Sequence, residues 1–165
     1  MMEFTFKLKY RLPDINGDAG SLEQQLADAG CDDALLGIGR PGRLALEFCR
    51  QSASAQDALL SALADVRKAV PGAELIEVSP DLVGLTDVAD LLGMSRQNMR
   101  KLLLAHTQTF PAPVHEGSAS IWHLADILSW LQARGSHKVS GELLELAAAA
   151  LEVNVAREAR RLQML

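Results

Sequence analysis

The sequence predicts an α+β protein in which strands and helices mix in the first half and helices dominate the second. Three observations lead to this class. Apolar and polar side chains alternate over residues 3–12, which is the period of a strand with one buried face. Apolar residues recur at helical spacing over residues 58–70 and form a stripe on one side of a helix. The same spacing returns in two short segments between residues 85 and 104.

The first strand is expected to bury every second side chain of residues 3–12. Two turn-forming pairs, at residues 13–14 and 16–17, end this strand. Ser21 is then expected to cap a short helix that closes at Gly30. The strand residues predicted to face the core are Phe4, Phe6, Leu8, Tyr10 and Leu12.

Three more strands and a longer helix complete this part of the chain. Two strands, at residues 34–38 and 43–49, are joined by a hairpin at residues 39–42. Ser54 caps the longer helix, which a Pro-Gly pair terminates. Residues 75–78 then form a last short strand. The predicted order of elements is therefore βαββαβ.

This order over residues 1–79 is that of a ferredoxin-like domain, an antiparallel sheet with both helices on one face. The assignment rests on element order alone and implies no sequence family. Such domains serve as dimerisation platforms or as sensors of a small-molecule or protein effector, and the sequence does not distinguish these roles.

Residues 37–42 match the letters of a dinucleotide-binding G-x-G-x-x-G. The phosphate-binding version needs a helix directly after the glycines, so that the helix N-terminus can hold the pyrophosphate. A strand is expected here instead, because apolar residues alternate after Pro41. We therefore expect no nucleotide site in this hairpin.

Residues 85–104 contain the most constrained pattern in the chain. Two short helices are expected on either side of Gly93, which can adopt the positive φ that a helix end requires. Ala89 is small where the two helices must cross, and Ser95 is placed to cap the second helix. These positions predict two packed helices joined by a tight turn.

This pattern resembles a helix-turn-helix, a family in which the second helix enters the major groove of DNA. The resemblance implies that Arg96, Gln97 and Arg100 meet base edges, since Arg matches guanine and Gln matches adenine. It implies phosphate contacts for four residues near the helix starts, namely Thr86, Ser95, Asn98 and Lys101. A helical hairpin with a solvated polar face is the alternative.

An extended segment with two prolines, residues 110–114, follows the second helix. A turn, a short strand that ends in Trp122 and a helix that contains Trp130 are expected next. Residues 82–135 would then form a winged helix-turn-helix. With the sequence FPAP and the two tryptophans, residues 82–134 resemble the MerR-like branch of these domains, which includes phage excisionases.

The wing departs from that family. Family members touch the DNA backbone or minor groove with the wing, whereas this wing has no Arg or Lys. Another basic segment or a second subunit would then have to supply the missing charge. The polar residues that the wing does offer are His115, Glu116, Ser118 and Ser120.

The remaining Trp, His and Cys residues are expected to have structural roles, and no pattern among them indicates catalysis. Trp122 and Trp130 are expected in the core instead of stacking on bases. The four histidines have no ligand spacing, so no metal site is predicted. Cys31 and Cys49 are expected to be buried thiols. No nucleophile, base and orienting group share a recognisable motif, so neither an enzyme nor a cofactor is predicted.

The net charge of −5 would repel a polyanion if it were evenly spread. Most of the excess negative charge lies in residues 1–80, which carry 8 basic and 12 acidic side chains. Residues 81–135 carry 4 basic residues, and three of them, Arg96, Arg100 and Lys101, fall on the second helix of the helix-turn-helix. This local concentration favours an anionic partner there.

Residues 139–165 are predicted to form one long helix with a continuous apolar seam. Either the protein's own domains or the same helix of a second chain must cover this seam, and we expect a homodimer. Asn154 could fix the register of that dimer or lie outside the interface. The basic residues from Arg157 onward could complement the helix dipole or lie along DNA. The residues expected at the dimer interface are Leu144, Ala148, Leu151, Val155 and Leu162.

These patterns together predict a sequence-specific transcriptional regulator that binds double-stranded DNA as a homodimer. No apolar run is long enough to span a membrane and no signal peptide is evident, so a cytoplasmic location is expected. One alternative is an architectural or recombination accessory protein of the excisionase kind. Another is a protein-interaction adaptor that keeps the winged fold and no longer binds DNA.

Overall fold

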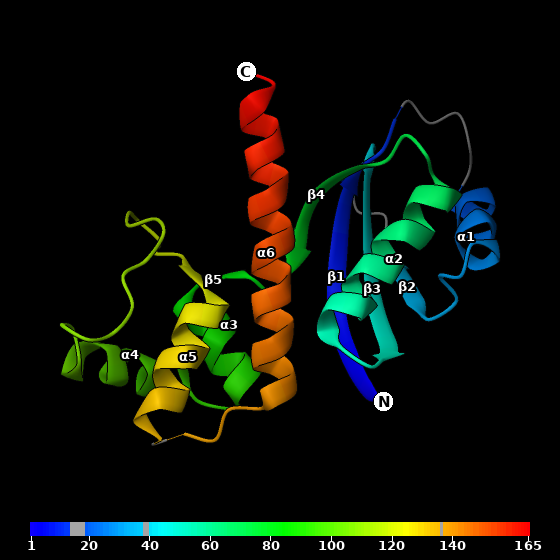
Figure 1. Cartoon of the computed structure of the whole chain (residues 1–165). Coiled ribbons are helices and arrows are strands. Elements are labelled where there is room, and N and C mark those ends of the chain that lie inside the picture. Colours follow the sequence, from blue (N-terminus) through cyan, green and yellow to red (C-terminus); the bar gives the residue numbers. More distant parts are fainter. Residues whose placement is uncertain (14–18, 38–39, 136) are drawn as a thin grey trace. The chain divides into compact units, whose positions relative to one another are not determined.

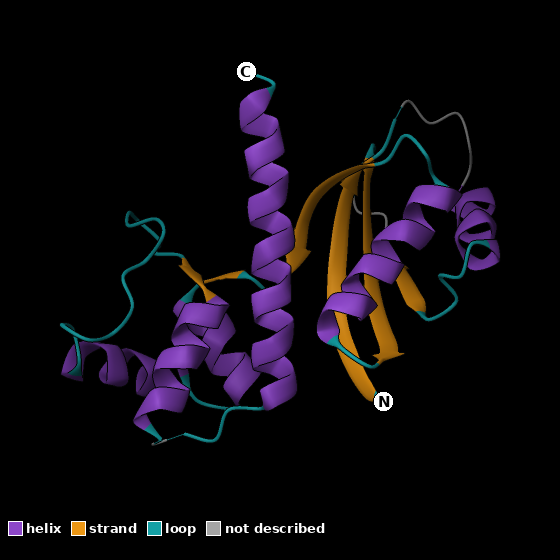
Figure 2. Ribbon diagram, in the orientation of Figure 1, coloured by secondary structure: helices purple, strands orange, loops and turns teal. Residues whose placement is uncertain are grey.

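The computed structural model describes residues 1–13, 19–37, 40–135 and 137–165. The chain forms two compact units, each described by itself below. The first unit comprises Met1–Ser79 and Glu152–Leu165, and the second comprises Pro80–Leu151. Helices occur together with an antiparallel sheet, as the predicted α+β class requires (Figures 1 and 2).

The first unit is built on a four-stranded sheet. Its elements are β1 (Met2–Arg11), α1 (Ala19–Asp28), β2 (Ala34–Gly37), β3 (Arg43–Ser52), α2 (Ala55–Ala69) and β4 (Glu74–Ser79). The strands lie in the order β2-β3-β1-β4, and each neighbouring pair is antiparallel. Helix α2 lies across β1 and β3, and α1 contacts α2 (Figure 1). The predicted sequence of strands and helices is therefore confirmed for this unit.

One face of β1 supplies much of the core of the first unit, as its alternating pattern predicted. Phe6 lies opposite Phe48 of β3, and their rings stack with centroids 5.3 Å apart. Burial of each such side chain contributes about 1.5–3 kcal/mol, so the face holds the sheet against α2. Phe4, Phe6, Leu8, Tyr10 and Leu12 are all buried, as are Ala55, Ala58, Leu59, Ala62 and Val66 of α2.

Three details of this unit differ from the sequence prediction. Helix α1 begins at Ala19, so Ser21 lies in its first turn and is not the N-cap. Strand β3 continues to Ser52, because its ladder with β1 extends that far. Cys49 is exposed and not a core thiol, since strand alternation turns it away from the face that buries Phe48.

The predicted turn at residues 16–17, the second residue of the turn at 13–14 and the start of the hairpin at residue 39 lie outside the described residues. In the rest of the hairpin, the backbone N–H of Arg43 donates to the carbonyl of Arg40 at 3.0 Å. Strand β3 begins at once, so no helix N-terminus follows these glycines. The expectation that a strand takes this place is confirmed.

Near the end of β3, all three guanidinium nitrogens of Arg50 form hydrogen bonds with neighbouring residues. Arg50 forms a bidentate pair with Asp33 at 2.8 and 2.9 Å and an ion pair with Asp65 at 2.9 Å. The remaining N–H groups donate to the carbonyl of Gly30 and the hydroxyl of Ser61. Hydrogen bonding to Asp33 is the main reason why the pKa of Arg50 is raised. This network joins β3, α2 and the turn after α1.

Helix α6 (Gly141–Gln163) contributes to both units, and its residues from Glu152 onward belong to the first. There its side chains bind the free edge of β4. Asn154 pairs with the backbone of Val78, and the Arg157 Nε–H donates to the carbonyl of Leu75. Asn154 is thus engaged within the chain instead of fixing a register between two chains, and Arg157 does not lie free along a DNA surface.

The second unit is mainly helical. Its elements are β5 (Leu82–Val83), α3 (Leu85–Leu92), α4 (Arg96–Ala105), β6 (Trp122–His123), α5 (Leu124–Arg134) and the first part of α6. Met99 of α4 and Val88 of α3 are fully buried in one core with Leu128 of α5. This shared core fixes which face of α4 remains exposed.

The predicted pair of helices between residues 85 and 104 is present. Gly93 ends α3 with φ +67° and ψ +29°, the left-handed conformation that its position requires. The Ser95 hydroxyl accepts the backbone N–H of Asn98 at 3.1 Å and caps α4. Ala89 is buried, and the N–H of Met94 donates to its carbonyl at 2.8 Å. The local predictions for this turn are confirmed.

The two-stranded sheet of this unit was only half predicted. Strand β6 includes the expected Trp122, but its partner is β5, with Val83 opposite Trp122. At the predicted wing, a single antiparallel bridge between His115 and Ile121 closes the turn. The sequence did not indicate β5, because two residues carry no readable alternation.

Candidate functional site

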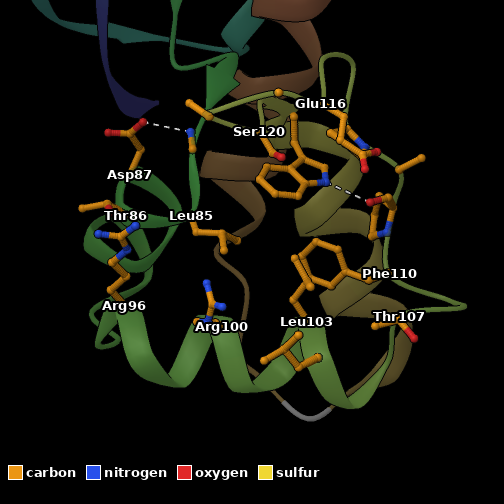
Figure 3. Close-up of a pocket in the computed structure, with 18 of the residues that line it drawn as sticks. Leu85, Thr86, Asp87, Arg96, Arg100, Leu103, Thr107, Phe110, Glu116 and Ser120 are labelled. Atoms are coloured by element: carbon orange, nitrogen blue, oxygen red, sulfur yellow. Dashed lines mark hydrogen bonds between the residues drawn. The ribbon is translucent and has the colours of Figure 1, made fainter.

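The second unit contains a groove of about 870 Å³ between α4 and the loop that leads to β6. Figure 3 shows α4 along one wall and the start of α3 beside it. Phe110 and Trp122 form part of an apolar floor, and Pro111 and Pro113 lie along the loop. A space of this size matches the volume of binding sites for ligands or peptide segments.

One stripe of α4 faces this groove. Arg96, Arg100 and Leu103 recur at steps of four and three residues and line it, as does Thr107, which follows the end of α4. Met99, three residues after Arg96 and four before Leu103, lies beside this stripe and is fully buried, so its packing in the core sets the rotation of the helix. In Figure 3 the Arg100 side chain projects from α4 into the groove.

The seven predicted DNA-contact residues divide into two groups. Three line the groove: Thr86, Arg96 and Arg100. The other four, Ser95, Gln97, Asn98 and Lys101, do not line it. All seven are exposed, so the structure leaves each side chain accessible at the surface of the second unit.

The cations of α4 have no internal partner. Among the described residues, Arg96, Arg100 and Lys101 form no ion pair and no side-chain hydrogen bond. Some basic residues of the first unit do have partners, since Lys9 pairs with Glu77 at 3.0 Å and Arg50 is fully bonded. The exposed face of α4 therefore carries positive charge that nothing described in this chain neutralises.

The groove also holds negative charge. Asp87 and Glu116 line it together with Arg96 and Arg100. The Asp87 carboxylate accepts the backbone N–H of Gly84 at 2.9 Å and thereby stabilises the first turn of α3. The space between α4 and the wing is thus electrically mixed, whereas the outer face with Lys101 is positive.

The loop between Phe110 and Trp122, where the wing was predicted, is held by aromatic packing. The Trp122 Nε1–H donates to the carbonyl of Pro111 at 2.8 Å. Phe110 contacts Trp122 and Trp130 edge-on, with centroids 5.9 and 5.0 Å away. Trp122 is 4% exposed, so its expected place in the core is confirmed. Arg134 stacks over the ring of Trp130 at 4.8 Å.

A contact between two ionisable side chains, His123 and the buried Asp81, links β5 to β6. The sequence did not indicate this contact. Asp81 is 1% exposed, and its carboxylate lies 2.6 Å from Nδ1 of His123. The backbone carbonyl of Asp81 also accepts the N–H of Leu124 at 2.7 Å. Because Asp81 follows Ser79-Pro80, it resembled a linker residue. Only the pairing of two distant strands reveals its role.

The predicted interface residues of α6 do not form one uncovered seam. Leu144 and Leu151 pack against the core of the second unit, so they are already used within the chain. Ala148, Val155 and Leu162 are exposed, with Val155 at 51% and Leu162 at 68%. The periodicity was correct, but the helix buries a different face, which includes Leu146, Ala147, Ala149 and Ala150.

The described residues offer little other reactive chemistry. Burial, reinforced by the nearby carboxylate of Asp65, raises the pKa of the Cys31 thiol to about 11 and so keeps it protonated. No group of three or more His, Cys, Asp or Glu within the described ranges could hold a metal ion. None of the helices described has the length and apolar content needed to cross a bilayer.

Comparisons with family models, with curated proteins and with solved structures gave no match to this chain.

Proposed function

We propose that this chain is a sequence-specific DNA-binding transcriptional regulator in which residues 82–135 act as a winged helix-turn-helix and α4 is the recognition helix. The observation that carries the proposal is the exposed face of α4, where Arg96, Arg100 and Lys101 have no partner among the described residues. Such a face gains most from a polyanion, because each phosphate it neutralises releases a condensed counterion.

The exposed residues of α4 divide by chemistry into base-reading and phosphate-binding groups. Arg96 and Arg100 can donate two hydrogen bonds to guanine, and Gln97 can pair with adenine. Lys101 and Asn98 suit phosphate oxygens, as does Thr86 at the start of α3. The Ser95 hydroxyl accepts from Asn98 in its capping role, which leaves its own hydrogen free to donate to a phosphate.

A homodimer would strengthen binding to two half-sites. One second unit alone would bind weakly, because Arg96 and Arg100 are assigned to bases and, of the α4 cations, only Lys101 is left to neutralise a phosphate and release its counterion. The exposed Ala148, Val155 and Leu162 follow each other at intervals of seven residues along α6 and offer an apolar stripe. The first unit, which we propose to be a ferredoxin-like domain from its βαββαβ order of elements, would add dimerisation or effector sensing in the cytoplasm.

Two other functions use the same surface. A recombination accessory protein of the excisionase kind would bind DNA through α4 but act by bending it. A protein-interaction adaptor is favoured by one specific observation, the two carboxylates and apolar floor of the groove. In that case a peptide instead of a DNA backbone would occupy the groove.

The decisive experiment selects binding sites from a random-sequence DNA library and measures the dissociation constant over a salt series. Wild type is compared with Arg96→Ala and Arg100→Ala, which should each lose about tenfold or more on the selected site and little on unrelated DNA. Arg43→Ala is the matched control. Arg43 is exposed on β3, and its replacement removes the same charge.

The outcomes separate the three functions. Selective, salt-dependent binding that Arg96→Ala and Arg100→Ala relax supports the regulator. Strong bending of the selected DNA with little dependence on half-site spacing supports the accessory protein. If wild type binds no DNA at any salt concentration, α4 does not read DNA and the adaptor is favoured.

A further inference from the structure

Glu116 places a negative charge at the wing where a DNA-binding surface ordinarily carries a positive one. Within residues 107–121, all of which the structure describes, it is the only Asp, Glu, Lys or Arg. Figure 3 shows Glu116 on the loop across the groove from α4, whose Arg100 extends into the same space. The groove therefore has a cationic wall and an acidic wall.

The charge of Glu116 is not committed to holding the fold. Its side chain is exposed and forms no ion pair or side-chain hydrogen bond with the described residues. Asp87, the other carboxylate of the groove, differs because it binds the N–H of Gly84 and stabilises α3. The fold thus accounts for the acid at residue 87 and gives no structural reason for one at residue 116.

We propose that Glu116 weakens the binding of DNA of every sequence, so that only a site with the correct base contacts is bound stably. This inference rests on the proposed function of α4. With α4 on DNA, the phosphates next to the helix approach the groove, and a carboxylate within a Debye length of about 8 Å raises their free energy whatever the sequence. Base contacts from Arg96 and Gln97 are confined to the correct site. The penalty therefore makes stable binding depend on those contacts.

The test compares Glu116→Gln with Glu145→Gln. Both variants remove one exposed carboxylate from the second unit, but Glu145 lies on α6 and does not line the groove. The probes are the site selected from the random library and unrelated duplex DNA of equal length. Glu116→Gln should bind both duplexes, the unrelated and the selected, about three- to fivefold more tightly than wild type.

Glu116→Lys extends the measurement in the same direction. It should raise affinity for the unrelated duplex by about tenfold or more and steepen the salt dependence by about one phosphate contact. If wild type binds DNA and Glu116→Gln gains no more than Glu145→Gln, the inference is overturned while the role of α4 stands. If wild type binds neither duplex, the proposed function and this inference both fail.

Discussion

The side-chain amide of Asn154 binds the backbone of Val78 in the way a neighbouring strand would. Its oxygen accepts the Val78 N–H and its nitrogen donates to the Val78 carbonyl, each at 2.8 Å. One amide thus satisfies both polar groups of an edge residue that is itself buried. Together with Arg157 on Leu75, it closes the edge of β4 to pairing with another chain.

Replacement of Asn154 by Ala should destabilise the protein by about 1–3 kcal/mol, because it leaves a buried N–H and a buried carbonyl without partners. Urea unfolding measures the free energy. Gln163→Ala is the control, since Gln163 carries the same amide in an exposed position on the same helix. Equal losses for the two variants would show that the pairing with Val78 contributes nothing.

Arg50→Lys should also be costly although it keeps the charge. A lysine ammonium cannot reproduce the fork that holds Asp33 while also reaching Asp65 and Gly30. We expect a loss of about 1–3 kcal/mol in the free energy of unfolding, because several partly buried acceptors of the network lose their donor. Arg43→Lys on the same strand serves as the control, and a loss no larger than that of the control contradicts the proposed importance of the network.

The two cysteines should differ in reactivity. Cys49 is exposed on the outer face of the sheet, whereas Cys31 is buried and has a pKa raised to about 11. A thiol reagent at neutral pH should therefore modify one thiol of the native protein quickly, and Cys49→Ser should abolish that fast phase. Cys31 should react only when the chain unfolds. Fast modification of the Cys49→Ser variant would refute this assignment.

The raised pKa of Cys31 also predicts a loss of stability in alkali. Below the ordinary thiol value of 9.0 both folded and unfolded chains keep the proton. As pH rises from 9 towards 11, the unfolded chain ionises first, so unfolding becomes easier. Tyr10, whose pKa burial raises, acts in the same direction at still higher pH. Urea midpoints measured across this range should fall less steeply for Cys31→Ala than for wild type.

Gly93→Ala should weaken the turn between α3 and α4 through its backbone alone. A Cβ at Gly93 would meet no atom within 4 Å, so the cost comes from φ +67° and amounts to about 1–2 kcal/mol. Gly141→Ala adds a methyl group in equally open space without a positive φ and should be neutral or stabilising. Thermal unfolding of both variants tests this, and an unchanged melting temperature for Gly93→Ala would contradict it.

The sequence predicted those parts of the fold in which the determining interaction is local. Ten residues of alternation made β1 readable, and the turn between α3 and α4 was readable because Gly93 and Ser95 each act within four positions. The exposure of the five proposed contact residues on α4 followed from helical spacing once the buried face of α4 was known.

What the sequence could not predict depends on partners far along the chain. The Asp81 contact with His123 spans 42 positions, and the pairing of Asn154 with Val78 spans 76. An isolated Asp after a proline and an Asn within a helix have the same local pattern whether or not such partners exist. The groove was equally invisible, because its shape depends on the path of the loop between Phe110 and Trp122.

The division of α6 between two units affects how the chain is completed during its synthesis. The strands of the first unit are made early, but the segment that closes the β4 edge, residues 152–165, is made only after the whole of Pro80–Leu151. A ribosome adds about 5–20 residues per second, so the nascent sheet has an open edge for several seconds. The first unit is thus the first whose synthesis starts and the last whose synthesis is complete. During this interval the open edge of β4 is most exposed to pairing with other nascent chains on the same messenger RNA.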